Sequence, residues 1–217
     1  LFNELQKRNR QITEALEQQT ATSEILGVIA SSPTDIQPVM DVLARNASRL
    51  GEAEDAVIFR LDGNVLQRAS VLGQIPSSTP VTPPVSRGFP MGRAVIDRQT
   101  IHVLDLAAEL ENEYPESKPA QQFSGARTVL ATPLLREGEP IGVIWIRRNV
   151  VRPFSDNQIA LLKTFADQAV IAVENVRLFN ELKESLEQQT ATSEILGVIA
   201  SSPTNIQPVL DVVTENA

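Results

Sequence analysis

The chain has 217 residues, of which 42% are hydrophobic, and with only seven Phe, one Trp and one Tyr its core must be largely aliphatic. Its formal net charge of −8 excludes the basic field that binding to nucleic acid or to an anionic membrane surface requires. The absence of cysteine excludes disulfides, thiolate metal sites, thiol catalysis and a thioether-linked chromophore.

One stretch of nineteen residues occurs twice. Residues 16–34 and 186–204 both read LEQQTATSEILGVIASSPT, 170 positions apart. The pentapeptide LFNEL occurs at 1–5 and again at 178–182, 177 positions apart, so the first copy carries one additional heptad. Because seven residues are close to two turns of an α-helix, this difference keeps the same helical face forward. The repeats therefore predict helices whose rotational phase matters.

Apolar residues in both copies alternate in steps of three and four, which is typical of a coiled-coil seam. Several seam positions carry Asn, Gln or Ser, and a competing register fits nearly as well, which suits a helix that shifts. An ordinary amphipathic surface helix is the alternative. The predicted dimer seam consists of Phe2, Leu5, Ile12, Leu16, Leu26, Leu161, Phe165, Ala172, Phe179, Leu182, Leu186 and Leu196.

The first predicted helix spans 1–31 and ends before Pro33, because proline disfavours helical geometry in the residue that precedes it. A second helix is predicted up to Leu50, with Thr34 or Asp35 as its cap and Gln37 completing a capping box. Period-two patterns then predict strands over 55–61 and 65–72, joined by a tight turn. A loop with five prolines follows over 73–90.

A short helix over 91–98 and a short strand over 101–104 lead into a polar, irregular segment at 106–126 that has one or two helical turns near its start. A second hairpin is predicted from strands over 128–135 and 140–147. Both faces of its second strand are apolar, which places that strand in the middle of a covered sheet.

The last predicted helix begins with a capping box formed by Ser155 and Gln158. No strong helix breaker follows before Pro203, so the helix would be about 65–70 Å long at 1.5 Å per residue. That length exceeds what one small domain covers. We expect one face of its first half to pack on the sheet, the seam face to meet a partner helix, and the second half to project.

This order of elements resembles a GAF domain over residues 34–177. The stretches that carry the resemblance are Gly88–Val95, Ile101–Asp105, the hairpin Arg127–Arg147 and the region from Phe154 to Gln168. The resemblance implies an α+β fold: a central antiparallel sheet of about six strands with helices on both sides, a ligand cavity on one face, and long terminal helices that pair in a parallel dimer. The flanking repeat resembles the linkers of tandem-GAF multi-sensor histidine kinases.

We therefore divide the chain into a linker helix (1–31), a GAF domain (32–177), a second linker helix (178–203) and the truncated start of a next repeat (204–217). It looks like a piece excised from a longer protein. No apolar run approaches the roughly 20 residues that span a bilayer, and no signal peptide is found. A cytoplasmic location is expected.

The resemblance also bears on cofactors, and it leaves their identity unknown. Asn149 and Phe154 match the beginning of a pattern found in cyclic-nucleotide-binding GAF domains, but the Lys and the Asp-Glu pair of that pattern are missing. Bilin-binding relatives and the free-methionine-sulfoxide reductases of this fold both need cysteine. A haem ligand at His102 is less expected than a structural role for this one histidine.

The candidate ligand-pocket residues each have a structural alternative. Asp105 would cap the irregular segment, Arg127 would be a solvated strand end, and Trp145 would pack in the core. No catalytic constellation, phosphate-cradling loop or metal-ligand spacing is found in the sequence. The candidate pocket residues are His102, Asp105, Tyr114, Phe123, Arg127 and Trp145.

The sequence thus predicts a non-catalytic sensor or signal-relay module that forms a homodimer through its terminal helices. Its expected partners are an unidentified small molecule and adjacent GAF or kinase domains of the same full-length chain, with no nucleic acid and no membrane. The alternative is a structural dimerisation spacer whose cavity is filled by its own side chains. A ligand found in the purified protein would favour the sensor.

Overall fold

A computed structural model describes residues 2–32, 34–73 and 82–201, and for part of the first helix it describes the backbone alone. Its α+β fold is built on an antiparallel sheet in the order β2-β1-β5-β4-β3. Five strands are thus present in the described ranges where about six were expected. Their bounds are β1 (Asp55–Asp62), β2 (Val65–Gly73), β3 (Ile101–Val103), β4 (Thr128–Arg136) and β5 (Glu139–Arg148).

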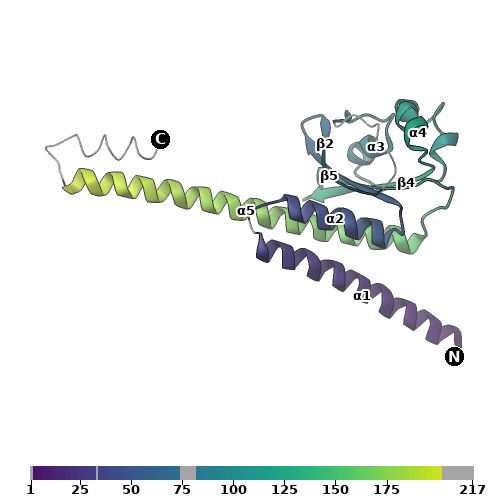
Figure 1. Cartoon of the computed structure of the whole chain (residues 1–217), viewed down its shortest axis with the longest axis horizontal. Helices are drawn as coiled ribbons and strands as arrows, with labels where there is room; N and C mark the ends of the chain where they lie inside the picture. Colours follow the sequence, from purple (N-terminus) through teal and green to yellow (C-terminus); the bar gives the residue numbers. More distant parts are fainter. Residues whose placement is uncertain (1, 33, 74–81, 202–217) are drawn as a thin grey trace.

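Helices cover both faces of this sheet (Figure 1). We call the face under the long helices the helical face and the opposite one the cap face. The helical face carries α1 (Phe2–Ser31), α2 (Gln37–Leu50) and α5 (Asp156–Ser201). The cap face carries α3 (Pro90–Asp97), α4 (Lys118–Ser124) and two 3₁₀ turns, Leu106–Ala108 and Pro115–Ser117.

The alternation along β5 divides the core into two clusters. Ile144 and Ile146 pack with the helices of the helical face, whereas Val143 and Trp145 pack with α3 and the loops of the cap face. Because successive side chains of a strand point to opposite faces, one strand serves both clusters. The expected central position of this strand is confirmed, since β5 lies between β1 and β4.

The predicted capping box of α5 is confirmed, whereas at α2 one of the two predicted caps, Asp35, accepts a backbone hydrogen bond and the predicted capping box is not formed. The backbone N–H of Ser155 donates to Gln158 Oε1 at 3.1 Å, and the N–H of Gln158 donates to Ser155 Oγ at 3.3 Å. At α2 the N–H of Gln37 instead donates to Asp35 Oδ1 at 2.9 Å. The Gln37 side chain donates to the Ala69 carbonyl of β2, so this residue binds the sheet rather than closing a capping box.

A buried arginine ties α2 and the loop before α5 together. The Arg148 side chain is 1% exposed, and it donates to the carbonyl oxygens of Gly51, Glu52, Arg152 and Pro153 at 2.6–3.3 Å. Its guanidinium also lies 4.1 Å from the centre of the Phe154 ring. Burial lowers the pKa of Arg148. The four carbonyl contacts replace the water that this cation has lost.

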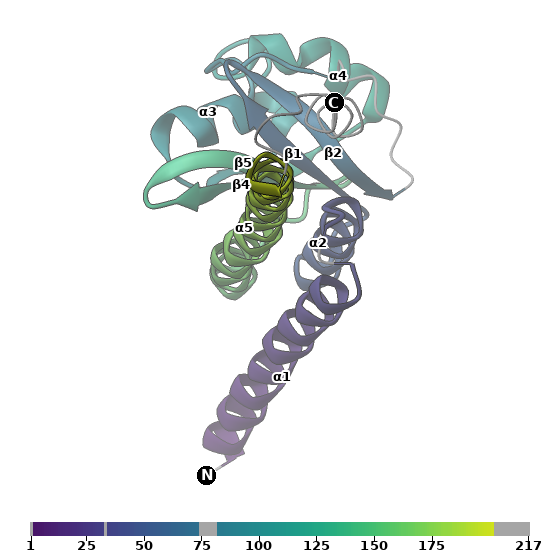
Figure 2. The ribbon, with the colours of Figure 1, turned by 90° about the vertical axis from the view of Figure 1, so that its left-hand side faces the viewer.

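Helix α5 has 46 residues, and its two halves have different surroundings. The first half lies against the sheet and α1, while the second half extends beyond the domain without cover (Figure 1). In Figure 2 α5 is seen nearly end-on, and α1 leaves the domain at an angle to it. None of the described helices has the length and apolar character needed to cross a membrane.

The structure corrects part of the predicted seam. Phe165 and Ala172, which were expected to face a partner chain, are 1% and 3% exposed and belong to the helical-face cluster. The reason is that α1 of the same chain packs on α5 and covers this row. Leu161 is half-buried. The remaining seam residues with described side chains are exposed: Leu16, Leu26, Phe179, Leu182, Leu186 and Leu196.

The predictions for the chain ends go beyond the described side chains. The side chains of Phe2, Leu5 and Ile12 in α1 are not among those described, and residues 204–217 lie outside the described ranges. The predicted loop over 73–90 is described only from residue 82 onward. These predictions stay predictions.

Candidate functional site

Three of the six predicted pocket residues line one open groove at the β3 edge of the sheet. His102, Asp105 and Tyr114 come together there with Glu109 and Glu113, in a groove of about 490 Å³. β3 supplies His102, and the 3₁₀ turn that follows the strand places Asp105 beside it. The groove is therefore acidic, but each predicted residue in it already has a partner.

His102 accepts a hydrogen bond at Nε2 from the backbone N–H of Phe154, 3.2 Å away. Its ring also makes an edge contact with the Phe154 ring at 5.6 Å between centres. Burial, and secondarily the positive charge of Arg148, lowers the pKa of His102. A neutral imidazole whose Nε2 is engaged holds the start of α5, which disfavours a haem ligand at this position.

Asp105 and Arg127 form a two-point ion pair, with Nε–Oδ1 and Nη2–Oδ2 distances of 2.7 and 2.6 Å. The hydrogen bond from Arg127 lowers the pKa of Asp105. Asp105 also accepts a hydrogen bond from the N–H of Ala107, so the predicted capping role is present. The fork geometry joins the end of β3 to the start of β4, and it occupies the guanidinium donors of Arg127 that a bound anion would need.

Tyr114 is buried under Arg93 of α3. The guanidinium lies 4.8 Å from the centre of the Tyr114 ring, and Nη1 donates to the phenol oxygen at 3.4 Å and to Glu113 at 2.5 Å. Burial raises the pKa of Tyr114. These contacts hold the irregular segment against α3 and leave the ring 5% exposed.

Trp145 lines a different cavity, and Phe123 lines neither the groove nor this cavity. Trp145 and Arg147 line a cavity of about 10 Å³ beneath Phe89 and Met91, which is about the volume of one water molecule. Phe123 is 61% exposed on α4, so the prediction that it walls a pocket is wrong. The short helix turns it outward, and a lone aromatic in a polar segment gave no periodicity from which its direction could be read.

The small cavity contains buried polar groups that lack partners. Trp145 Nε1 and Arg147 Nε have no hydrogen-bond partner within the described residues. Arg147 forms an ion pair with Asp55 of β1, and both side chains are at most 4% exposed. Burial lowers the pKa of Arg147 to about 10, so the guanidinium remains charged at neutral pH. Asp55 and the Arg147-Arg148 pair were missed at the sequence level, although charges that continue a strand with two covered faces must be buried.

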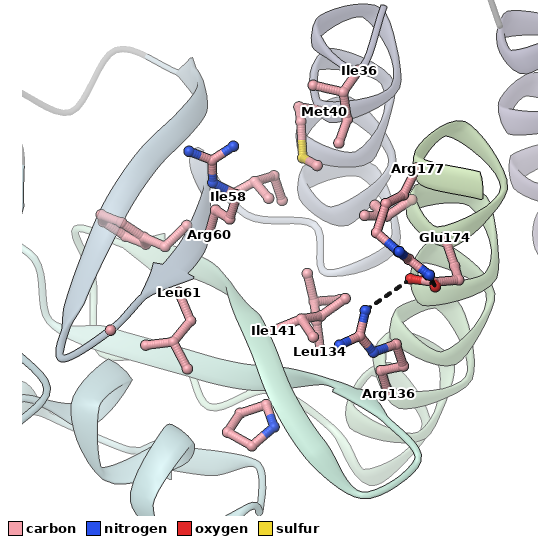
Figure 3. Close-up of a pocket in the computed structure, with 14 residues that line it drawn as sticks. Ile36, Met40, Ile58, Arg60, Leu61, Leu134, Arg136, Ile141, Glu174 and Arg177 are labelled. Carbon is pink, nitrogen blue, oxygen red and sulfur yellow. Dashed lines mark hydrogen bonds and ion pairs between the residues drawn. The ribbon is translucent and has the colours of Figure 1, made fainter. Parts of the chain in front are cut away.

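A cleft with largely apolar walls lies on the helical face, where no site was predicted. It has about 450 Å³ and is bounded by the start of α2, by β1, by the end of β4 and the start of β5, and by α5 (Figure 3). Its apolar walls include Met40, Ile58, Ile141 and Val173. Residues from five elements form it, so no local motif marks it in the sequence.

A charged network closes one side of this cleft. Arg136 of β4 and Arg177 of α5 both point toward Glu174 in Figure 3, at 3.1 Å for Arg136 Nη1 and 2.7 Å for Arg177 Nε. Arg177 also pairs with Glu181, one turn farther along the helix. The hydrogen bond from Arg177, followed by that from Arg136, lowers the pKa of Glu174. The network joins the β4–β5 hairpin to α5 at the point where the helix leaves the domain.

The described residues show no constellation for metal chemistry. No group of three or more His, Asp or Glu side chains in the described ranges is arranged to hold a metal ion. The cleft instead offers an apolar wall with ion pairs at its edge. The groove offers an acidic surface. Both arrangements suit binding and conformational coupling.

The sequence matches the family model described as GAF domain over residues 33–174. No curated protein matches it. The fold is similar to the GAF domain of an Acinetobacter phosphoenolpyruvate-protein phosphotransferase, at 16% identity and a TM-score of 0.59, covering 74% of this chain and 95% of that one. It is also similar to a free methionine-R-sulfoxide reductase from Neisseria meningitidis in complex with its substrate, at 21% identity and a TM-score of 0.61, covering 76% and 93%.

A third similar structure is the GAF-B domain of DevS from Mycobacterium smegmatis, at 22% identity and a TM-score of 0.56, covering 68% of this chain and 99% of that one. At these identities the likeness shows the fold alone. The neighbours include an enzyme and domains described simply as GAF domains, so the similarity by itself assigns no activity.

Proposed function

Because the chain belongs to the GAF domain family, we propose that it is a non-catalytic signal-relay module of a signalling protein. It forms a dimer through the projecting half of α5 and passes the conformational state of the domain along this helix to a following domain such as a histidine kinase. The domain acts by biasing helix geometry and performs no chemistry of its own.

The observation that carries this proposal is the continuity of α5. One helix begins in the core, where Leu162 and Phe165 are at most 1% exposed, and runs unbroken to Ser201. A helix that is fixed at one end and free at the other transmits a displacement of its base to its tip, because its hydrogen-bonded backbone does not absorb the change locally.

The second support is the charged network at the exit of the helix. Arg136 reaches Glu174 from β4, so a change in the hairpin or in the adjacent cleft acts directly on α5. Arg177 continues the contact to Glu181 on the projecting part. Coupling of this kind requires that a signal favour one of two helix positions, which a shift between alternative ion pairs provides.

The third support is the apolar surface of the projecting half. Leu178, Phe179, Leu182, Leu186 and Leu196 are 44–68% exposed. Large apolar side chains in a row on an uncovered helix are typical of an interaction surface. A parallel pairing of two such helices would cover this row in a homodimer.

The dimer is tested by light scattering coupled to size exclusion. The wild-type chain is expected at twice the monomer mass, and Leu182→Glu with Leu186→Glu at the monomer mass. Gln188→Glu, which changes another exposed position of the same helix, serves as the matched control and is expected to remain dimeric. A wild-type chain that stays monomeric at high concentration would overturn the proposed pairing.

Relay is tested in the full-length protein by its output activity. Insertion of one, two or four residues after Leu186 is expected to disturb the output, whereas insertion of seven is expected to preserve it, because seven residues keep the helical face. Equal effects of all insertions would exclude a relay that depends on helix phase.

A structural spacer is the second candidate, and one observation favours it. The cap-face cavity beside Trp145 has about 10 Å³, which leaves no room for a ligand larger than water. Native mass spectrometry, before and after denaturation, distinguishes the two functions. A small molecule that co-purifies with the folded chain supports a sensor, and repeatedly empty preparations support a spacer.

A further inference from the structure

The same amino-acid sequence occurs in two surroundings within this one structure. Residues 16–34 and 186–204 are identical; residues 16–31 lie in α1, and residues 186–201 lie in the projecting half of α5. Equal sequences have equal preferences for burial, so a difference in burial between them shows which contacts the second copy lacks.

In α1 one face of the repeated sequence is covered. Ala21 and Ile25 are 0% and 2% exposed, in a cluster with residues of α2 and α5. Between them, Glu24 accepts a hydrogen bond from Asn46 Nδ2 of α2 at 2.9 Å and lies 3.6 Å from Arg49 Nη1. Two small or branched apolar groups and one carboxylate thus form a docking face that matches α2.

In α5 the equivalent face is open. Ala191 and Ile195 are partly exposed, and Glu194 is exposed and makes no hydrogen bond or ion pair with the residues that the structure describes. The polar acceptor and the two apolar side chains are all present in the same order, without the helix that covers them in the first copy.

The opposite face of the repeat behaves differently and serves as an internal reference. Leu16 and Leu26 are each 57% exposed in the first copy, and their counterparts Leu186 and Leu196 are 61% and 60% exposed in the second. Since each residue advances by about 100° around a helix, these leucines lie roughly across the helix from Ala21 and Ile25. The leucine face is thus open in both copies, whereas the face with Ala and Ile is covered in the first copy only.

The sequences that follow the two copies are also similar to each other. Residues 35–47 read DIQPVMDVLARNA, and residues 205–217 read NIQPVLDVVTENA. Val209, Val212 and Asn216 stand where α2 has Val39, Val42 and Asn46. Val39 and Val42 are buried under the long helices, and Asn46 is the residue that binds Glu24.

We infer that Ala191, Glu194 and Ile195 form the docking face for a second GAF unit that follows in the same chain and whose sequence begins with residues 205–217. In that unit the asparagine equivalent to Asn46 donates to the carboxylate of Glu194, as Asn46 does to Glu24, and the apolar pair enters the surface between the helices of the unit. The projecting half of α5 is therefore shared: its leucine face pairs with a partner chain, and its Ala191–Ile195 face holds the next domain.

The inference extends the proposed relay, because it names the domain that the helix reaches. It also predicts that successive GAF units are held at a fixed angle by a helix common to both, rather than joined by a free linker. Rotation of α5 would then turn the following unit as a body.

The test uses a two-unit protein in which Thr204 of the complete chain is followed by residues 35–201 of a second copy. The join falls at the end of the identical stretch. Ile195→Glu is expected to lower the Tm of the second unit by about 10 °C or more, because a buried charge without a partner is severely destabilising. Ile25→Glu is expected to have the same effect on the first unit. In the present chain Ile195→Glu is expected to leave the Tm unchanged.

Leu196→Glu is the matched control on the opposite face and is expected to spare the Tm of both units. If Ile25→Glu prevents folding, the milder pair Ile25→Ala and Ile195→Ala gives the same comparison. An unchanged Tm for Ile195→Glu in the two-unit protein would overturn the docking face, and so would an increase in oligomer mass caused by the second unit docking on another chain. The Tm of the second unit is measured within one chain. The test therefore gives its result whether or not the chains dimerise.

Discussion

The two faces of the sheet differ in how completely they are filled. On the cap face, the inner cavity beside Trp145 has about 10 Å³, and the open groove of about 490 Å³ lies outside it at the β3 edge of the sheet. On the helical face a cleft of about 450 Å³ opens next to α5. A tightly packed face resists deformation, whereas an incompletely filled one accommodates two arrangements. We therefore expect movement in this domain on the helical side, where α5 lies.

The largest expected effect compares truncations on the two faces. Phe89→Ala removes a ring that is 7% exposed in the cap-face cluster and should lower the free energy of unfolding by about 3–5 kcal/mol. Ile141→Ala, at the half-buried wall of the cleft, should lower it by about 1–2 kcal/mol, because part of its surface already faces the cleft. Urea unfolding measures both. Equal losses would mean that the two faces are packed alike.

The next effect concerns Arg148, which joins the end of α2 to the loop before α5. Arg148→Met leaves four carbonyl oxygens without their donor and should lower the free energy of unfolding by about 3 kcal/mol. Arg152→Met removes a half-exposed guanidinium nearby and is the matched control, with an expected loss below about 1 kcal/mol. If both variants unfold at the same urea concentration, Arg148 does not hold this end of the domain.

A smaller effect is expected from acid. The pKa of His102 is lowered in the folded state by burial and by Arg148, so the unfolded chain binds a proton more readily than the folded one. The stabilisation is complete above the unfolded value of 6.5 and is lost as the pH falls below it toward the folded value.

His102→Gln keeps an acceptor near the Nε2 position but has no group that titrates in this range. The fall in Tm between pH 7 and pH 5 should therefore be shallower in this variant than in the wild type. Parallel curves for the two proteins would show that His102 does not contribute to the pH dependence of the Tm.

The smallest expected change in stability tests the network beside the cleft. Glu174→Gln weakens the half-exposed pairs with Arg136 and Arg177, which should cost less than about 1 kcal/mol. Hydrogen exchange of the α5 amides near the exit should nevertheless become faster, since the hairpin no longer holds the helix. Glu187→Gln, in a pair farther along α5, is the control. Unchanged exchange at the exit would mean that the network is a surface feature without a coupling role.

Local chemistry decided which elements were predictable from the sequence. The reciprocal bonds of Ser155 and Gln158 arise from residues three apart, and the strand limits follow from turns and period-two patterns, so both could be read directly. The apolar row through Phe165 and Ala172 was also read, but its cover was assigned to a partner chain. Periodicity shows that a face is buried and does not show what buries it.

The candidate site was less predictable because its parts are distant in sequence. The partner of His102 is a backbone group 52 positions away, and the cleft is built by five elements. Arg148 is bonded to carbonyls 96 and 97 positions away. Backbone partners carry no side-chain signature, so no pattern in one sequence marks these contacts.

Because α5 is unbroken, a small tilt at its base produces a larger displacement at its far end. From residue 177 to Ser201 the helix extends about 37 Å beyond its last core contacts at 1.5 Å per residue, so a tilt of about 5° at the base moves the tip by about 3 Å. That displacement is comparable to the length of a hydrogen bond. In the proposed relay, a small tilt caused by the loss of an ion pair near residue 177 would therefore be large enough at Ser201 to exchange contacts.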